Sequence, residues 1–289
     1  MNKDDAWQEV TKLVENYVQL VRVELRARWE KWKLDLENKE MYEAIGALLA
    51  RQVTLSTQMA LSPGIWNGHI APVLLRSMTD AHITLAWILK EPLERSRQFI
   101  VFGLGQEKLL VEHRKTQLEA DGLDPENDPL VKASEAWLNS QLFTFLTEVN
   151  VGNWAGKDVR TMAEEADCKS LYNFAYSPFS SVAHNMWSHI SRYNLVECPN
   201  PLHRYHKTPI DPPTSPDIDY LYRAAKYVQK SFKLFDEKFN IEPGVPSGFD
   251  FLVETLERFG REAKEAEKQS IVAPADTVQD TENPIPEQN

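Results

Sequence analysis

Residues 72–90, PVLLRSMTDAHITLAWILK, decide how the rest of the chain must pack. A helix turns by about 100° per residue, so Leu74 and Met78 share one face whereas Trp87 lies on the other. A helix that is apolar on nearly every side is buried at the centre of a domain. The stretch therefore predicts a central helix over residues 70–90, surrounded by other helices.

The rest of the chain also has a helical pattern. Apolar residues recur at spacings of three and four, and no run alternates apolar and polar residues strongly enough to predict a sheet. Breakers such as Ser62-Pro63-Gly64 separate the segments. The predicted fold class is all-α, a single bundle-like domain of about nine helices. The expected ranges are 4–36, 39–61, 70–90, 92–120, 129–149, 158–166, 177–193, 217–240 and 248–267.

Breaks in the pattern divide the chain into five segments. Residues 1–66 are expected to form a long helical pair, which could be an oligomer surface, and residues 67–195 a core helical domain that carries the candidate site. Residues 196–216 are rich in proline and predict an irregular loop. Residues 217–269 are expected to pack on the core as C-terminal helices. Residues 270–289 have little apolar surface to bury and predict a disordered tail.

Composition excludes several classes of protein. A net charge of −11 argues against a broad nucleic-acid-binding surface, because phosphate binding rests on lysine and arginine. No apolar run approaches the roughly 18 residues of a membrane span, and the first residues do not resemble a secretory signal. Cys168 and Cys198 are too few for a disulfide framework and suggest reduced thiols. We expect a cytoplasmic protein with no membrane contact, and the absence of phosphate-binding and dinucleotide-binding motifs predicts no cofactor.

Two charged residues lie on the predicted central helix. Arg76 and Asp80 are four residues apart, on the side of Trp87. Buried charge is costly unless it is paired. Either the two residues form a pair that satisfies itself, or they are held in a dry place because they act on a substrate. His82 falls within the apolar stripe and is expected to be a core histidine with one backbone partner.

A second informative stretch, SPFSSVAHNMWSHISRY, begins at Ser177-Pro178, a typical N-cap and first helical position. In one continuous helix, Ser180, His184 and Ser188 form a stripe beside the apolar face. Small neighbours would let another helix approach His184. A carboxylate could then orient one ring nitrogen and leave the other as a general base. The alternative is a solvated surface stripe.

The two stretches together resemble a known family. LLRSMTDAHITLAWIL, followed later by YNFAYSPFSSVAHNMWSH, is similar to the uncharacterised bacterial helical domain-of-unknown-function family 5677. The resemblance covers roughly residues 45–195 and implies an all-helical fold and a site, but no established activity. This chain has Asp80 where the family more often has glutamate, so a contact to His184 would need a closer helix approach. The implied site residues are Arg76, Asp80, Tyr172, Tyr176, Ser180 and His184.

A looser resemblance is to the HEPN helical ribonucleases, whose motif is an arginine followed several residues later by a histidine, usually in a dimer. Arg76 and His82 in RSMTDAH fit this spacing. In a helix, however, these two side chains point about 120° apart. Arg76 with His184 would make a better composite, in which a cation holds a phosphate and a base activates a ribose hydroxyl.

One further cluster has metal-binding side chains. Cys198, His203 and His206 form a C-x(4)-H-x(2)-H pattern in the proline-rich loop. Structural zinc sites usually have a fourth ligand and paired cysteines at tighter spacing. The spacing therefore predicts no metal site.

These observations give one function hypothesis and one alternative. The hypothesis is a cytoplasmic defence or stress effector, a ribonuclease-like or nucleotide-directed enzyme acting on RNA or a nucleotide. The alternative is a non-catalytic interaction or scaffold protein, a homodimer through its N-terminal helices, in which the same residues form a buried polar network. A site must open to a cleft, whereas a network would be sealed. The hypothesis assigns catalysis to Arg76, Asp80 and His184, and substrate binding or support to Tyr172, Tyr176, Ser180, Ser188 and His82.

Overall fold

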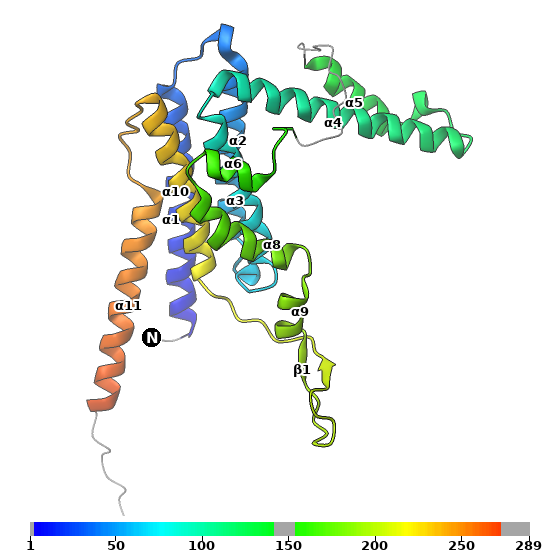
Figure 1. Cartoon of the computed structure of the whole chain (residues 1–289). Helices are drawn as coiled ribbons and strands as arrows, with labels where there is room; N and C mark the ends of the chain where they lie inside the picture. The colour runs from blue at the N-terminus through cyan, green and yellow to red at the C-terminus, as the bar shows by residue number, and fades with distance from the viewer. Residues whose placement is uncertain (1–2, 142–153, 273–289) are drawn as a thin grey trace, which may run out of the picture.

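The fold is built around helix α3, Ala71–Ile88, as the computed structural model of residues 3–141 and 154–272 shows (Figure 1). Helices α2, Lys39–Ala60, and α10, Asp219–Phe239, pack along it. Leu75, Met78, Ile83, Leu85 and Ile88 of α3 are fully buried. The prediction of a central buried helix and an all-α fold is confirmed.

Two further long helices complete this bundle. Helix α1, Lys3–Lys31, and helix α11, Gly248–Val272, lie side by side next to α2 and α10 (Figure 1). Arg28 of α1 donates to Asp236 of α10, with 2.8 Å between Nη2 and Oδ2. Glu24 accepts a hydrogen bond from the backbone of Gly248 at 2.8 Å. The N-terminal helices therefore share one core with the C-terminal ones.

An arm projects from the bundle (Figure 1). It consists of α4, Pro92–Ala120, and α5, Pro129–Ser140, which enclose a small apolar cluster of their own. Asp128 caps α5 by accepting from the backbone N–H groups of Leu130 and Val131. The rest of the helix predicted at 129–149 lies outside the described residues.

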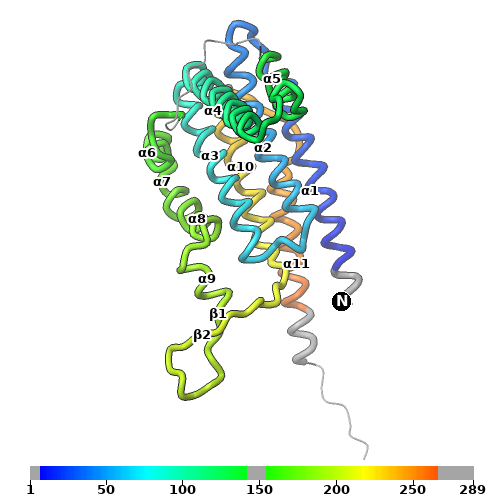
Figure 2. The backbone as a smooth tube through the Cα atoms, turned by 90° about the vertical axis from the view of Figure 1, so that its right-hand side faces the viewer, coloured from blue at the N-terminus to red at the C-terminus, as the bar shows by residue number. Residues whose placement is uncertain are grey.

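A row of short helices covers the other side of α3 (Figure 2). Its backbone is helical across Ser177, whose N–H donates to the carbonyl of Tyr172, so Ser177 is not the predicted N-cap. Pro178 has no backbone N–H to donate, and in the π turn directly before it the hydrogen bonds span five residues instead of four. The row consists of α6, Val159–Glu165, α7, Lys169–Leu171, a π turn, Tyr172–Tyr176, α8, Ser177–Ala183, and α9, Trp187–Tyr193.

The prediction of a single helix over 177–193 is wrong, because one helix ends at Ala183 and the next begins at Trp187. Asn185 adopts a left-handed conformation with φ of +52°, and the N–H of Met186 returns to the carbonyl of Ser181 at 2.8 Å. This is the hydrogen bond of a Schellman helix end, and asparagine is one of the few residues that tolerate its left-handed position. Ser188 therefore does not continue the predicted stripe of Ser180 and His184.

A small hairpin lies between α9 and α10. The loop predicted at 196–216 contains a hairpin of β1, Leu195–Glu197, and β2, Lys207–Pro209, paired antiparallel with Val196 opposite Thr208. Helix α1 ends at Lys31, earlier than the predicted residue 36. Helix α11 continues to Val272, through the first residues of the tail predicted at 270–289. Residues 273–289 lie outside the described residues. No described helix is long and apolar enough to cross a bilayer. In the described part of the chain, 3-10 turns lie at Leu36–Asn38, Pro63–Ile65 and Pro125–Asn127.

Candidate functional site

Arg76 is the centre of a polar network between α3 and the row of short helices. Its Nε donates to Ser180 Oγ at 2.7 Å, and its Nη2 donates to the hydroxyl of Tyr176. The guanidinium carbon lies 3.4 Å from the centre of the Tyr176 ring. Ser180 in turn donates to the carbonyl of Tyr176 at 2.8 Å. The network thus binds α8 and the π turn to α3.

Asp80 forms the outer edge of this network. Its Oδ2 lies 3.6 Å from Nη1 of Arg76, and its side chain is 45% exposed whereas that of Arg76 is 18% exposed. Burial raises the pKa of the Asp80 carboxyl, and the nearby Arg76 charge opposes that rise. Burial also raises the pKa of Tyr176. Each guanidinium nitrogen of Arg76 is therefore engaged with a partner inside the protein.

Tyr172 extends the network toward the surface. Its ring stacks on that of Tyr176, with 4.9 Å between centroids and 21° between planes. The two rings form one wall of an open hollow of about 280 Å³, which Lys157 and Arg160 also line. The structure thus brings together Arg76, Asp80, Tyr172, Tyr176 and Ser180.

His184 and Ser188 do not join this group. His184 is exposed at the end of α8, and its backbone N–H donates to the carbonyl of Ser180 at 3.0 Å. Across the described ranges, no hydrogen bond or ion pair is found between the His184 ring and Arg76 or Asp80. Because helix α8 ends just before Asn185, Ser188 belongs to a separate helix, α9. The signal in the sequence was that asparagine, which is favoured at left-handed helix ends.

His82 lies on another side of α3 and faces α10. Its ring is buried, 5% exposed, and Nδ1 lies 2.9 Å from Ser231 Oγ. The Ser231 hydroxyl also lies 2.9 Å from the carbonyl of Tyr227, to which it can donate its single hydrogen. We assign the ring proton to Nδ1 on this basis, which leaves a lone pair on Nε2. The predicted backbone partner of His82 was wrong, since the partner is a side-chain hydroxyl.

The electrostatics keep the His82 ring neutral. Burial, and then the charge of Lys230, lower the pKa of His82 to about 4. A neutral imidazole with its proton on Nδ1 presents an acceptor at Nε2. His82 can therefore accept a hydrogen bond from a ligand at neutral pH without carrying charge.

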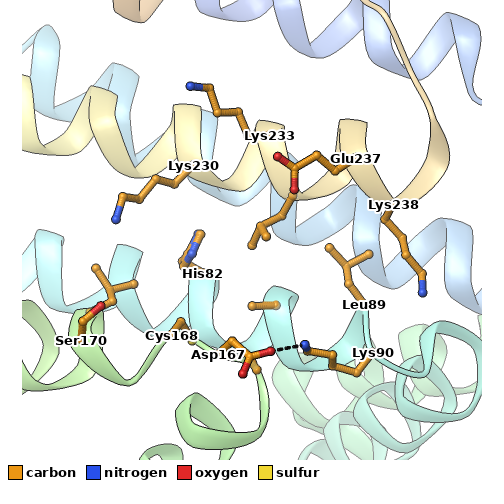
Figure 3. Close-up of a pocket in the computed structure, with 14 residues that line it drawn as sticks. His82, Leu89, Lys90, Asp167, Cys168, Ser170, Lys230, Lys233, Glu237 and Lys238 are labelled. Atoms are coloured by element: carbon orange, nitrogen blue, oxygen red, sulfur yellow. Dashed lines mark hydrogen bonds and ion pairs between the residues drawn. The ribbon is translucent and has the colours of Figure 1, made fainter.

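This ring lines the floor of a cleft of about 650 Å³ between α3, α10 and the α6–α7 turn (Figure 3). Apolar side chains such as Ala86 and Leu89 line part of it. Lys90 Nζ pairs with Asp167 at 2.6 Å, and Glu237 is the other lining carboxylate. The basic side chains that line the cleft are Lys90, Lys230, Lys233 and Lys238. The cleft is therefore locally basic on an acidic protein.

The α6–α7 turn shapes the second wall of the cleft. Asp167 has a φ of +57°, and the N–H of Cys168 returns to the carbonyl of Ala163 at 2.8 Å, which ends α6 sharply. Cys168 faces the cleft, and burial raises the pKa of its thiol to about 11, so it stays protonated at neutral pH. Sequence reasoning missed this cleft, because the α10 lysines repeat at helical spacing and resemble a solvated face.

A comparison with known families gives one result. The model of a family of unknown function, DUF5677, matches residues 42–200, more than half of the chain. The chain belongs to the DUF5677 family. The matched region contains Arg76, His82 and the row of short helices, whereas Ser231 and the α10 lysines lie beyond it. Neither the curated proteins nor the solved structures contain a match to this DUF5677 protein.

Proposed function

We propose that this DUF5677 protein binds a nucleotide, or a similar small phosphorylated molecule, in the cleft over His82. The observation that supports the proposal most is a lysine-lined cleft on a protein of net charge −11. Its volume of about 650 Å³ is within the usual range for small-molecule sites. Four lysines against two carboxylates leave the cleft with an excess of positive charge, and a concave site with such an excess concentrates ligands of the opposite sign.

The individual groups of the cleft match such a ligand. The ammonium groups of Lys230 and Lys238, which lie on the side of α10 that faces α3 (Figure 3), supply the cations that a phosphate requires. Nε2 of His82 is an acceptor for a hydroxyl or a ring N–H group, and the apolar floor suits a base or another flat ring. The carboxylate of Glu237 is a further acceptor for a sugar hydroxyl.

Calorimetric titration with ATP, adenosine and inorganic triphosphate tests the proposal. We expect ATP to bind, adenosine to bind at least tenfold more weakly, and the double variant Lys230→Gln/Lys238→Gln to lose about tenfold in affinity, roughly 1.4 kcal/mol. The matched control is Lys132→Gln/Lys108→Gln on the arm, which changes the net charge equally and should leave binding unchanged. Absence of binding by all three probes, or equal losses in both double variants, would contradict the proposal.

It stays a prediction that the protein is an RNA-directed defence or stress effector acting through Arg76, Asp80 and His184. Its cytoplasmic location and its likeness to the HEPN ribonucleases also stay predictions. His184 is exposed, as a catalytic base must be, but it stands apart from Arg76. RNA integrity in cells that express the wild type or His184→Ala tests the prediction. RNA cleaved by the wild type alone would support it, and intact RNA with both proteins would contradict constitutive cleavage.

A second proposal concerns the Arg76 network, which we propose has a structural and not a catalytic role. The supporting observation is that Tyr176, Ser180 and Asp80 engage the guanidinium within the protein.

A non-catalytic protein of this kind would also fit the homodimer predicted through residues 1–66. Helix α1 exposes the large apolar side chain of Trp7. Light scattering of the wild type and Trp7→Glu tests the dimer, which the substitution should dissociate.

A further inference from the structure

The tip of the β1–β2 hairpin brings three metal-binding side chains together. One ligand atom from each of Cys198, His203 and His206 lies within 4.8 Å of the other two. Cys198 Sγ is 3.6 Å from Nδ1 of His203, and the two histidine rings are 5.5 Å apart between centroids. The chain has seven histidines and two cysteines in all, so this gathering within one short loop is a notable concentration.

Backbone hydrogen bonds fix the three positions. Glu197 pairs with Lys207 in the hairpin, and the next N–H, that of Cys198, donates to the carbonyl of His206 at 3.0 Å. Cys198 and His206 therefore face each other across the end of the ladder. The N–H of His203 donates to the carbonyl of Asn200 at 3.0 Å, in a turn that returns this residue to the same side.

A second contact orients His203. The side-chain amide of Asn200 lies 3.2 Å from its Nε2, whereas Nδ1 faces the sulfur of Cys198. Polar groups that hold the second ring nitrogen are typical of histidines that bind metals, because they fix the direction of the first nitrogen. The expectation of no metal site rested on the missing fourth ligand and on linear spacing, and the hairpin removes the objection from spacing by closing the loop.

We propose that Cys198, His203 and His206 bind one zinc ion at the hairpin tip. One thiolate with two imidazoles is a donor set that suits Zn²⁺, with a fourth tetrahedral position left for water or another molecule. Zinc bonds of about 2.0–2.3 Å place neighbouring donors roughly 3.3–3.8 Å apart. The Cys198–His203 pair already has this spacing, so binding requires only a modest closure of the loop around His206.

Binding has defined chemical consequences. The Cys198 thiol gives up its proton as the sulfur–zinc bond forms, and each histidine must bind as the neutral ring, so affinity falls as the pH is lowered. The ion would join β1 to β2 at the end of the molecule opposite the arm (Figure 2). The family match ends at residue 200, so His203 and His206 lie outside the region that the family model describes.

The test uses the full chain, stripped with a chelator and then titrated with Co²⁺ and Zn²⁺. We expect one Co²⁺ per chain, a thiolate-to-cobalt absorption band and its displacement by Zn²⁺. Cys198→Ser should abolish the band, and His206→Ala should weaken Co²⁺ binding at least tenfold. The matched control is Cys168→Ser, which should keep the band, since Cys168 lies in the cleft over His82.

Circular dichroism checks that the variants fold; the hairpin lies apart from the main core, so they should. A band that survives in Cys198→Ser and disappears in Cys168→Ser would overturn the proposal. A wild type that binds no Co²⁺ or Zn²⁺ at micromolar concentration would also overturn it. Because none of these readouts involves ATP or the cleft, the result is independent of the proposed function.

Discussion

Helix α3 carries two polar side chains, Arg76 and His82, that differ in whether a hydrogen-bonding atom is left without a partner in the described structure. The guanidinium of Arg76 is held by Tyr176, Ser180 and Asp80. The ring of His82 is more deeply buried and lines the cleft, yet its one described hydrogen bond uses Nδ1 and leaves Nε2 without a described partner. A charge on a buried helix is therefore not in itself a site. A buried polar atom that faces an open cleft is the stronger indication of a ligand.

The largest expected effect at neutral pH is on the Arg76 network. Arg76→Met should lower the free energy of unfolding by about 2 kcal/mol, because the half-buried hydroxyls of Tyr176 and Ser180 lose their charged donor. Urea denaturation at neutral pH measures the change. The control is Arg114→Met, which breaks the pair of the half-exposed Arg114 with Asp128 on the arm and should cost about 1 kcal/mol or less. Equal losses would show that the network adds nothing beyond a surface ion pair.

The next expected effect concerns the neutral ring of His82 and depends on pH. The folded protein keeps this ring neutral down to about pH 4, whereas in the unfolded chain it takes up a proton near its ordinary pKa of 6.5. The unfolded chain therefore binds more protons between these values, and the free energy of unfolding falls as the pH falls through this window. The contribution lost by pH 4 amounts to roughly 3 kcal/mol at most.

Comparison with His82→Gln isolates this contribution from the carboxylates that titrate in the same range. Urea denaturation between pH 7 and 4 should show a shallower pH dependence for the variant. Parallel curves for both proteins would mean that the His82 ring takes up its proton in the folded state as readily as in the unfolded chain.

The smallest effect is expected at Asp80. Burial raises the pKa of this carboxyl, so its ionised form is disfavoured in the fold, and an amide would still offer Arg76 an oxygen. Since the side chain is nearly half exposed, Asp80→Asn should change the free energy of unfolding by no more than about 0.5 kcal/mol. A loss as large as that of Arg76→Met would instead make Asp80 an essential member of the network.

The sequence was sufficient where a long apolar pattern decided the structure. The central position of α3 follows from its apolar character on nearly every side, and the long helices α2, α4 and α10 begin and end close to their predicted residues. The family resemblance also correctly grouped Arg76 with Tyr176 and Ser180, although they are distant in the sequence.

The sequence was insufficient where a single residue or a tertiary contact decided the structure. The apolar periodicity continues across Asn185, so only the left-handed preference of that residue signalled the helix end. Ser231 is far from His82 along the chain, and nothing local indicates their contact. The cleft exists only because the turn at Asp167 docks opposite α10, which no pattern within either segment predicts.

The central claim is that His82 presents a free acceptor to a phosphorylated ligand. Long-range proton–nitrogen NMR spectra of histidine-labelled protein, recorded with and without ATP at neutral pH, test it most directly. We predict a neutral His82 ring with its proton on Nδ1, and a clear shift of the Nε2 signal when ATP is added. A ring protonated on Nε2, or an Nε2 signal unchanged at saturating ATP, would contradict the account.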